Sequence, residues 1–175
     1  MTIRLAERKL RTRFGEFTEI LYYDGQSESI ALVMGDVRGQ TEVLCRIHSA
    51  CIGGHVFNSV ECECAAEITA AQRDIQEAGT GVIVYLDQEG KGNGHLALMR
   101  SIPFKELGLN QSDAYQKAGY PADARTYRPA AGILADLGVV SVVLLTSNAG
   151  KADELRDLRI TVSEERHLNL NDDLF

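Results

Sequence analysis

The sequence predicts an α/β protein, with mixed β-sheets flanked by helices, in a single domain. Strand-like segments fill the first part of the 175-residue chain, and strands alternate with helices in the rest. A run of strands followed by strand–helix alternation is typical of this fold class. A chain of this length is long enough to bury one core, so we expect one domain over residues 1–175, with a frayed tail from about 166.

Four strand-like segments come first, over residues 2–13, 16–23, 29–34 and 43–48. Phe14 and Gly15 suit a turn between the first two, and the glycine-bearing stretch 35–40 separates the last two. His48 and Cys51 therefore stand at or just after a strand end. Ligands held by a rigid scaffold are often found in this position.

The first helix follows the cysteine-rich segment. The spacing of small and apolar residues over 66–75 predicts an amphipathic helix that ends at Gly79. The apolar run 81–86 then predicts a buried strand. Residues 90–94 contain three glycines and predict a flexible loop, after which a helix begins at His95.

Two further alternations complete the pattern. Residues 128–137 predict a helix, because Pro129 suits its first turn and Gly138 follows its end. The remaining segments are a buried strand over 139–145, a polar turn over 146–151 that begins a short helix to Leu158, a strand over 160–162, and an acidic end over 169–175 that we expect to fray.

The composition limits the classes of partner. The chain is 45% hydrophobic and carries a formal net charge of −7 without a block of Lys and Arg, which argues against a nucleic-acid surface. No apolar run approaches the roughly 20 residues of a membrane span. No signal peptide is apparent, so we do not expect disulfides among the four cysteines. We expect a cytoplasmic protein that acts on a small molecule, with neither a membrane nor a nucleic acid as partner.

Three cysteines, Cys51, Cys62 and Cys64, form a C-x10-C-x-C pattern. Three soft thiolates suit Zn²⁺, and three protein ligands leave a coordination position for water. A zinc ion in such an open site lowers the pKa of its bound water to about 7. The pattern therefore favours metal-assisted hydrolysis.

Two other interpretations of the cysteines stay open. His48 or His55 could supply a fourth ligand, which would make the zinc site structural and closed. The cysteines could also be ordinary buried thiols. We expect this of Cys45, because it lies in the apolar run 43–47, where a small hydrophobic side chain suits a strand.

Five short motifs occur in order along the chain: Arg46-Ile47-His48-Ser49-x-Cys51, Cys62-x-Cys64, Gln88-Glu89-Gly90, Asp123-x-Arg125 and Thr146-x-Asn148-x-x-Lys151. In these motifs and their spacing the sequence resembles GTP cyclohydrolase II, the zinc enzyme that opens riboflavin synthesis. The resemblance extends from about Ala31 to Val162.

The resemblance implies a reaction on a guanine nucleotide. In the family, three cysteines hold Zn²⁺ and its water attacks C8 of guanine, and a second hydrolysis releases formate. Loss of pyrophosphate with the help of Mg²⁺ is also implied, with Arg125 as nucleophile and Asp123 as its proton acceptor. An arginine is normally protonated, so Asp123 could instead orient Arg125 for binding phosphate. Taken alone, the two residues would be a surface ion pair. The resemblance also implies a homodimer.

The resemblance further implies a set of substrate-binding residues: Arg46, His48, Ser49, Glu67, Glu89, Lys91, Gln111, Thr146 and Lys151. Glu89 follows a buried strand, where it could meet a base edge or serve as a catalytic group in proton transfer. Lys151, at the start of a short helix, could hold a phosphate or ribose oxygen with Thr146. The alternatives are a solvated loop carboxylate and a solvated lysine.

The sequence departs from the family pattern in the motifs themselves. A glutamate before the first cysteine is Ala50, Thr-Gly-Asp reads Gly53-Gly54-His55, an arginine is Glu61, a glutamine is Glu67, an arginine is Lys91, a threonine is Gln111, and a tyrosine aligns near Ile102. A pocket for a triphosphate should not gain carboxylates. The same chemistry on another purine, a pterin or a related heterocycle therefore stays open, as does a catalytically silent zinc protein.

Overall fold

The computed structural model describes residues 2–146 and 149–170. Asn148, which belongs to the last of the five motifs, lies outside the described residues, as does the segment 171–175 of the expected tail. The strands are β1 (Ile3–Thr12), β2 (Gly15–Tyr23), β3 (Glu28–Met34), β4 (Val43–Ser49), β5 (Gly81–Leu86), β6 (Ser141–Leu145) and β7 (Thr161–Arg166). The helices are α1 (Ile52–Val56), α2 (Cys64–Ala78), α3 (His95–Glu106), α4 (Gln111–Lys117), α5 (Arg128–Leu137) and α6 (Ala149–Asp157).

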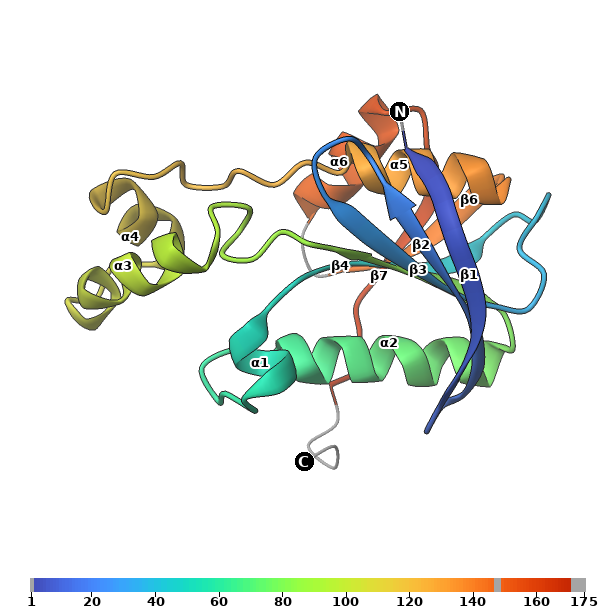
Figure 1. The fold of residues 1–175 in the computed structure, drawn as a ribbon, viewed down its shortest axis with the longest axis horizontal. Coiled ribbons are helices and arrows are strands. Elements are labelled where there is room, and N and C mark those ends of the chain that lie inside the picture. Colours follow the sequence, from blue (N-terminus) through green and yellow to red (C-terminus); the bar gives the residue numbers. More distant parts are fainter. Residues whose placement is uncertain (1, 147–148, 171–175) are drawn as a thin grey trace.

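The seven strands of the described chain form one mixed sheet in the order β1-β2-β3-β5-β4-β6-β7. The pairs from β1 to β5 are antiparallel, whereas β5, β4, β6 and β7 run parallel. Helix α2 covers one face of the sheet, and α5 and α6 cover the other (Figure 1). The predicted α/β class with mixed pairing is confirmed.

Alternate side chains of β5 enter two apolar clusters on opposite faces of the sheet. Val82 and Val84 pack in the cluster that contains Ile133 of α5, and Ile83 packs in the cluster that contains Ile75 of α2. Successive strand residues point to opposite faces, so a continuous apolar run suits a strand that is covered on both sides. The central strands are thereby fixed in place, and so are the residues at their ends.

The carboxyl ends of β4, β5 and β6 lie at one edge of the sheet, because the three strands run parallel. Cys51 follows β4, Glu89 follows β5 and Thr146 follows β6. Ligands of α/β proteins usually bind outside the carboxyl ends of the strands. The fold therefore brings three of the sequence motifs to one place.

The structure contains two short helices that the sequence did not predict. Helix α1 includes two glycines, which have low helix propensity. Its start is held by contacts with the cysteine side chain before it and with Glu89, which accepts a hydrogen bond from the Ile52 amide at 2.7 Å. Helix α4 begins at Asn110, whose side chain accepts from the Asp113 amide at 3.0 Å. Strand β6 also begins later than expected, and β7 extends to Arg166.

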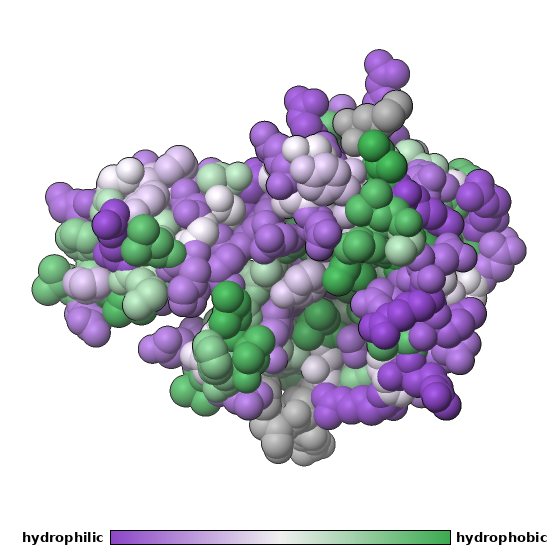
Figure 2. All heavy atoms as spheres, viewed as in Figure 1, coloured by the Kyte–Doolittle hydropathy of each residue, from purple (hydrophilic) through white to green (hydrophobic). Residues whose placement is uncertain are grey.

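Helices α3 and α4 form an arm that projects from the sheet (Figure 1), and α3 packs chiefly against α4. Figure 2 shows apolar side chains over this arm and over the region of α1. The exposed apolar residues there include Leu96, Met99 and Leu107 in the arm and Phe57 and Val60 after α1. Within the described chain, none of the helices has the length and apolarity needed to span a bilayer.

Candidate metal centre

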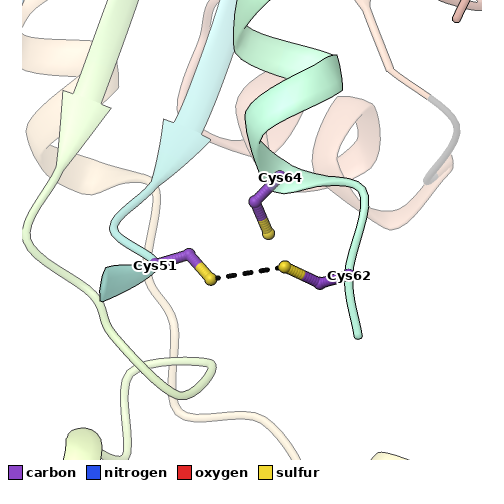
Figure 3. A group of neighbouring side chains, drawn as sticks. All are labelled: Cys51, Cys62 and Cys64. Atoms are coloured by element: carbon purple, nitrogen blue, oxygen red, sulfur yellow. Dashed lines mark hydrogen bonds between the residues drawn. The ribbon is translucent and has the colours of Figure 1, made fainter. Parts of the chain in front are cut away.

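The side chains of Cys51, Cys62 and Cys64 converge at the carboxyl edge of the sheet (Figure 3). Their sulfur atoms all lie within 4.8 Å of one another, and the Cys51 and Cys62 sulfurs are 3.6 Å apart. A tetrahedral zinc ion with Zn–S bonds of about 2.3 Å would hold its sulfur ligands about 3.8 Å apart. The donor atoms and their spacing therefore fit zinc without a large rearrangement.

Gly54 allows the sulfur atoms to approach one another. A Cβ at this position would lie 3.0 Å from the Cys62 sulfur and 3.2 Å from the Cys64 Cβ. The Gly54 amide also donates a hydrogen bond to the Cys51 sulfur at 3.4 Å. Cys45 lies apart from this cluster and is fully buried in the core, as predicted, where burial raises its pKa to about 12.

Burial raises the pKa of Cys51 and of Cys64. The cost of burial falls on the charged form, so these thiols are neutral unless a cation compensates for their charge. A divalent metal ion deprotonates coordinating thiols and supplies that compensation. The burial and the chemistry of the cluster thus agree with a metal site.

The ring nitrogens of the two candidate histidines contact each other and backbone or hydroxyl groups, and they do not join the three sulfur atoms. His48 Nε2 lies 2.8 Å from His55 Nε2, and His55 Nδ1 lies 3.3 Å from the Tyr85 hydroxyl. Among the described residues, the atoms close enough to share a metal ion come from the three cysteines. The arrangement does not support a zinc site closed by His48 or His55. Tyr85, on the strand predicted to be buried, is partly exposed.

A cavity of about 290 Å³ adjoins the cysteines, and we call it the cation-lined cavity. It brings together most of the residues that the sequence predicted for substrate binding or catalysis, namely Arg46, His48, Ser49, Glu67, Glu89, Lys91, Gln111, Arg125 and Lys151. Asp123 does not line the cavity but is hydrogen-bonded to Arg125, which does. Thr146 is buried directly after β6.

Arg46 is 3% exposed, and the protein engages each nitrogen of its guanidinium group. The group donates to Glu67 Oε2 at 2.6 Å, to the Leu145 carbonyl at 3.0 Å and to His48 Nδ1 at 3.4 Å. Burial lowers the pKa of Arg46, and the charge of Glu67 opposes this effect. The carboxylate that the sequence places at Glu67 is therefore paired within the cavity wall.

Asp123 and Arg125 form a bidentate pair. Arg125 Nε lies 3.0 Å from Asp123 Oδ1, and Nη2 lies 2.5 Å from Oδ2. This interaction raises the pKa of Arg125. Burial opposes ionisation of Asp123, but the hydrogen bonds from Arg125 prevail and lower the pKa of its carboxyl. The Arg125 side chain is only 15% exposed and lines the cavity, so the pair differs from an ordinary surface ion pair.

Lys151 and Glu89 are both buried, which contradicts the alternative interpretation of the two as solvated side chains. Lys151 is 7% exposed, and its Nζ donates to the Ile47 carbonyl at 3.1 Å. Burial lowers the pKa of Lys151 to about 8, and the charges of Arg46 and Arg125 act in the same direction. Glu89 is 9% exposed and holds the start of α1.

Two buried polar atoms in the cavity wall lack a partner among the described residues. They are the Ser49 hydroxyl and the Gln88 side-chain oxygen. A buried polar group without a hydrogen bond costs about 1–3 kcal/mol. These atoms mark where a polar ligand would be stabilised.

A second cavity of about 380 Å³ also adjoins the cysteines. It shares Cys51, Cys62, Leu98 and Gln111 with the first cavity. Leu98 and Ile102 of α3 form part of its wall, together with the charged residues Glu61, Lys105 and Glu106, and we call it the second cavity. Cys51 and Cys62 thus line two adjoining cavities.

The fold and the site together define a class of protein. This is an α/β protein in which a cysteine cluster able to bind a metal ion opens onto a cavity with cationic walls.

Comparison with known proteins identifies the family. The model of the GTP cyclohydrolase II family matches residues 3–167. The GTP cyclohydrolase-2 of Histophilus somni (strain 2336) is 38% identical over 173 residues, which cover 98% of this chain and 80% of that protein. The GTP cyclohydrolase-2 of Streptomyces coelicolor is 41% identical over 165 residues, covering 93% and 74% respectively. The chain belongs to the GTP cyclohydrolase II family.

Longer proteins also match. The riboflavin biosynthesis protein RibBA of Bacillus cytotoxicus is 40% identical over 166 residues, and the match covers 94% of this chain but 42% of that protein. Among solved structures, RibBX, a two-domain 3,4-dihydroxy-2-butanone 4-phosphate synthase from A. baumannii, matches with a TM-score of 0.48 and 20% identity. That match covers 84% of this chain and 34% of the other.

Proposed function

We propose that this protein is a zinc-dependent hydrolase that opens the imidazole ring of a guanine nucleotide. The observation that carries the proposal is the convergence of three thiols on a cavity that also contains Arg125 and Lys151. Family membership supports the same reaction, because the relatives described above are named GTP cyclohydrolase-2.

Cys51, Cys62 and Cys64 would hold the metal ion. When bound there, zinc supplies a water with a pKa of about 7 as the nucleophile for C8 of the purine. Glu89 holds the turn that follows Cys51 and also lines the cavity. We assign it the task of fixing that turn and of accepting a proton from the substrate.

Arg125 and Lys151 would bind phosphate. Asp123 keeps the guanidinium of Arg125 charged and fixed in orientation, as bidentate phosphate recognition requires. The raised pKa of Arg125 favours this role over that of a nucleophile, because a protonated guanidinium has no free electron pair to donate. Release of pyrophosphate with Mg²⁺ stays a prediction of the resemblance.

We place a purine nucleotide across the two adjoining cavities. C8 is the imidazole carbon farthest from the six-membered ring, and the neighbouring N9 carries the ribose and phosphates. With C8 at the thiol cluster, phosphates would occupy the cation-lined cavity, and the six-membered ring would extend toward Leu98 and Ile102. The unpartnered Ser49 hydroxyl would meet a polar group of the same ligand.

A second candidate is the same reaction on another purine, a pterin or a related heterocycle. The observation that favours it is the lining of the second cavity, which contains Glu61 and Ile102. The family pattern has an arginine and a tyrosine at the corresponding places. A different ring edge would therefore meet different hydrogen-bonding groups in this chain.

The test follows the C8 proton of GTP by NMR with zinc-loaded protein. We expect the C8 proton signal to disappear with the wild type and with Cys45→Ala, a control that removes a thiol outside the cluster. We expect Cys62→Ser to retain the fold by circular dichroism but to lose zinc and turnover. An unchanged C8 signal with every guanine nucleotide would contradict the proposal. Loss of the corresponding proton from another heterocycle would then favour the second candidate.

A further inference from the structure

Helix α1 places Cys51, yet its own sequence favours a helix only weakly. It contains five residues, two of them the glycines Gly53 and Gly54. Short helices with low propensity do not hold their shape alone. The position of the Cys51 side chain therefore depends on what fastens α1 to the sheet.

The imidazole of His55 provides such a fastening. The Cys51 amide donates to His55 Nδ1 at 3.3 Å, and the Tyr85 hydroxyl on β5 is 3.3 Å from the same nitrogen. On its other side, His55 Nε2 is 2.8 Å from Nε2 of His48 on β4. The ring thus connects α1 to two neighbouring strands of the sheet.

The far end of this series of contacts is buried. His48 is 2% exposed and lies 3.4 Å from the Nε of Arg46, which can only donate. The amide of Cys51, at the near end, can also only donate.

We propose that His55 is a positioning residue, which holds the turn of Cys51 against the buried pair Arg46–His48 and thereby sets the metal affinity of the three thiols. The inference rests on the proposed metal site but concerns a residue that would not touch the metal. Partners that orient metal ligands in this way typically change metal affinity by about 10–100-fold when they are removed.

The same contacts indicate which substitution of His55 should preserve the position of Cys51. The family pattern has an aspartate where this chain has His55. A carboxylate has no hydrogen to place and can accept from both the Cys51 amide and His48 Nε2. His55→Asp should therefore preserve the positioning, whereas His55→Ala should not.

The experiment measures the zinc dissociation constant of the full chain by competition with a chromophoric chelator. We expect His55→Ala to raise the constant about 10–100-fold, and His55→Asp to stay within about threefold of the wild type. His167→Ala, which removes an exposed histidine outside the site, should have no effect. Melting temperatures of the metal-free forms separate general loss of folding from loss of positioning.

An unchanged zinc affinity in His55→Ala would overturn the inference, as would an equal loss in His55→Ala and His55→Asp. Zinc bound to the wild type without any ring opening would overturn the proposed function instead and leave the effect of His55 measurable. A wild type that binds no zinc would overturn both.

Discussion

Among single residues, Lys151 is a charged group that the fold buries beside two other cations, Arg46 and Arg125. Its pKa is lowered to about 8 from an ordinary value of 10.5, first by burial and then by Arg46 and Arg125. Between these two values the unfolded chain binds a proton that the folded chain has lost. The contribution of Lys151 to the free energy of unfolding therefore increases as the pH rises from about 8 to 10.5. The affinity for an anionic ligand should instead decrease over this range, because the positive charge is lost.

We predict that affinity for a guanine nucleotide falls as the pH rises above about 8, because Lys151 then loses the charge that attracts phosphate. Calorimetric titration at several pH values measures this dependence. In Lys151→Arg the dependence should disappear, since a guanidinium stays protonated over this range. The same fall in affinity in both proteins would show that another group is responsible.

The ion pair of Glu67 with Arg46 could not be predicted from the sequence. As a replacement for a neutral amide, Glu67 looked unfavourable for an anionic ligand. The structure pairs it with Arg46 at 2.6 Å, a contact that depends on how α2 lies across β4. The residue types of the site were predictable from the motifs. Their pairing, and the contact of His48 with His55, required the three-dimensional arrangement.

At the scale of elements, the loop after β5 contacts a segment that is distant in the sequence and contains Asp123 and Arg125. The Ala124 amide donates to the Lys91 carbonyl at 2.9 Å. Gly92 has a φ of 79°, and a Cβ there would lie 2.7 Å from the Ala124 carbonyl carbon. The two segments approach so closely because position 92 has no side chain.

We predict that Gly92→Ala displaces the Asp123–Arg125 segment and lowers kcat/KM by at least about tenfold, because misplacing a substrate-positioning group is costly. Gly108→Ala is the matched control. Gly108 also has a positive φ, of 93°, but its Cβ would have no neighbour within 4 Å. Each substitution should cost about 1–2 kcal/mol of stability through backbone strain, measured by thermal unfolding. Equal activity of the two variants would contradict the prediction.

The elements with strong local signals were predicted well. Helices α2 and α5 end at Gly79 and Gly138, both in the left-handed conformation that glycine favours. Helix α1 has weak propensity, and its anchor on Glu89 comes from a distant part of the chain. The end of β7 carries the exposed residues 163–166, whose polarity concealed the strand. In these cases tertiary contacts, rather than local preference, decide the structure.

At the scale of the whole molecule, α3 and α4 pack mainly against each other and form an arm that projects from the sheet (Figure 1). It nevertheless reaches the cavity, because Lys91 Nζ donates to Ser112 of α4 at 3.0 Å and Gln111 lines both cavities. A ligand that bridges the cavity would therefore connect the arm to the sheet.

We predict that backbone amides of α3 and α4 exchange with deuterium faster than those of β4 and β5, because the arm has fewer contacts that must break before it opens. A bound nucleotide should slow exchange in the arm and leave the central strands unchanged. Hydrogen-exchange mass spectrometry measures both effects. Equal exchange in arm and sheet, or an arm insensitive to ligand, would disagree with this account. The homodimer that the resemblance implies stays a prediction.

X-ray absorption at the zinc edge of the purified protein tests most directly whether the three cysteines form an open zinc site. We expect three sulfur neighbours at about 2.3 Å and one oxygen or nitrogen neighbour at about 2.0 Å. Cys62→Ser should lose one sulfur neighbour or the metal itself, whereas Cys45→Ala should leave the spectrum unchanged. Four sulfur neighbours, a histidine signature in the fourth position, or no zinc at all would contradict the account.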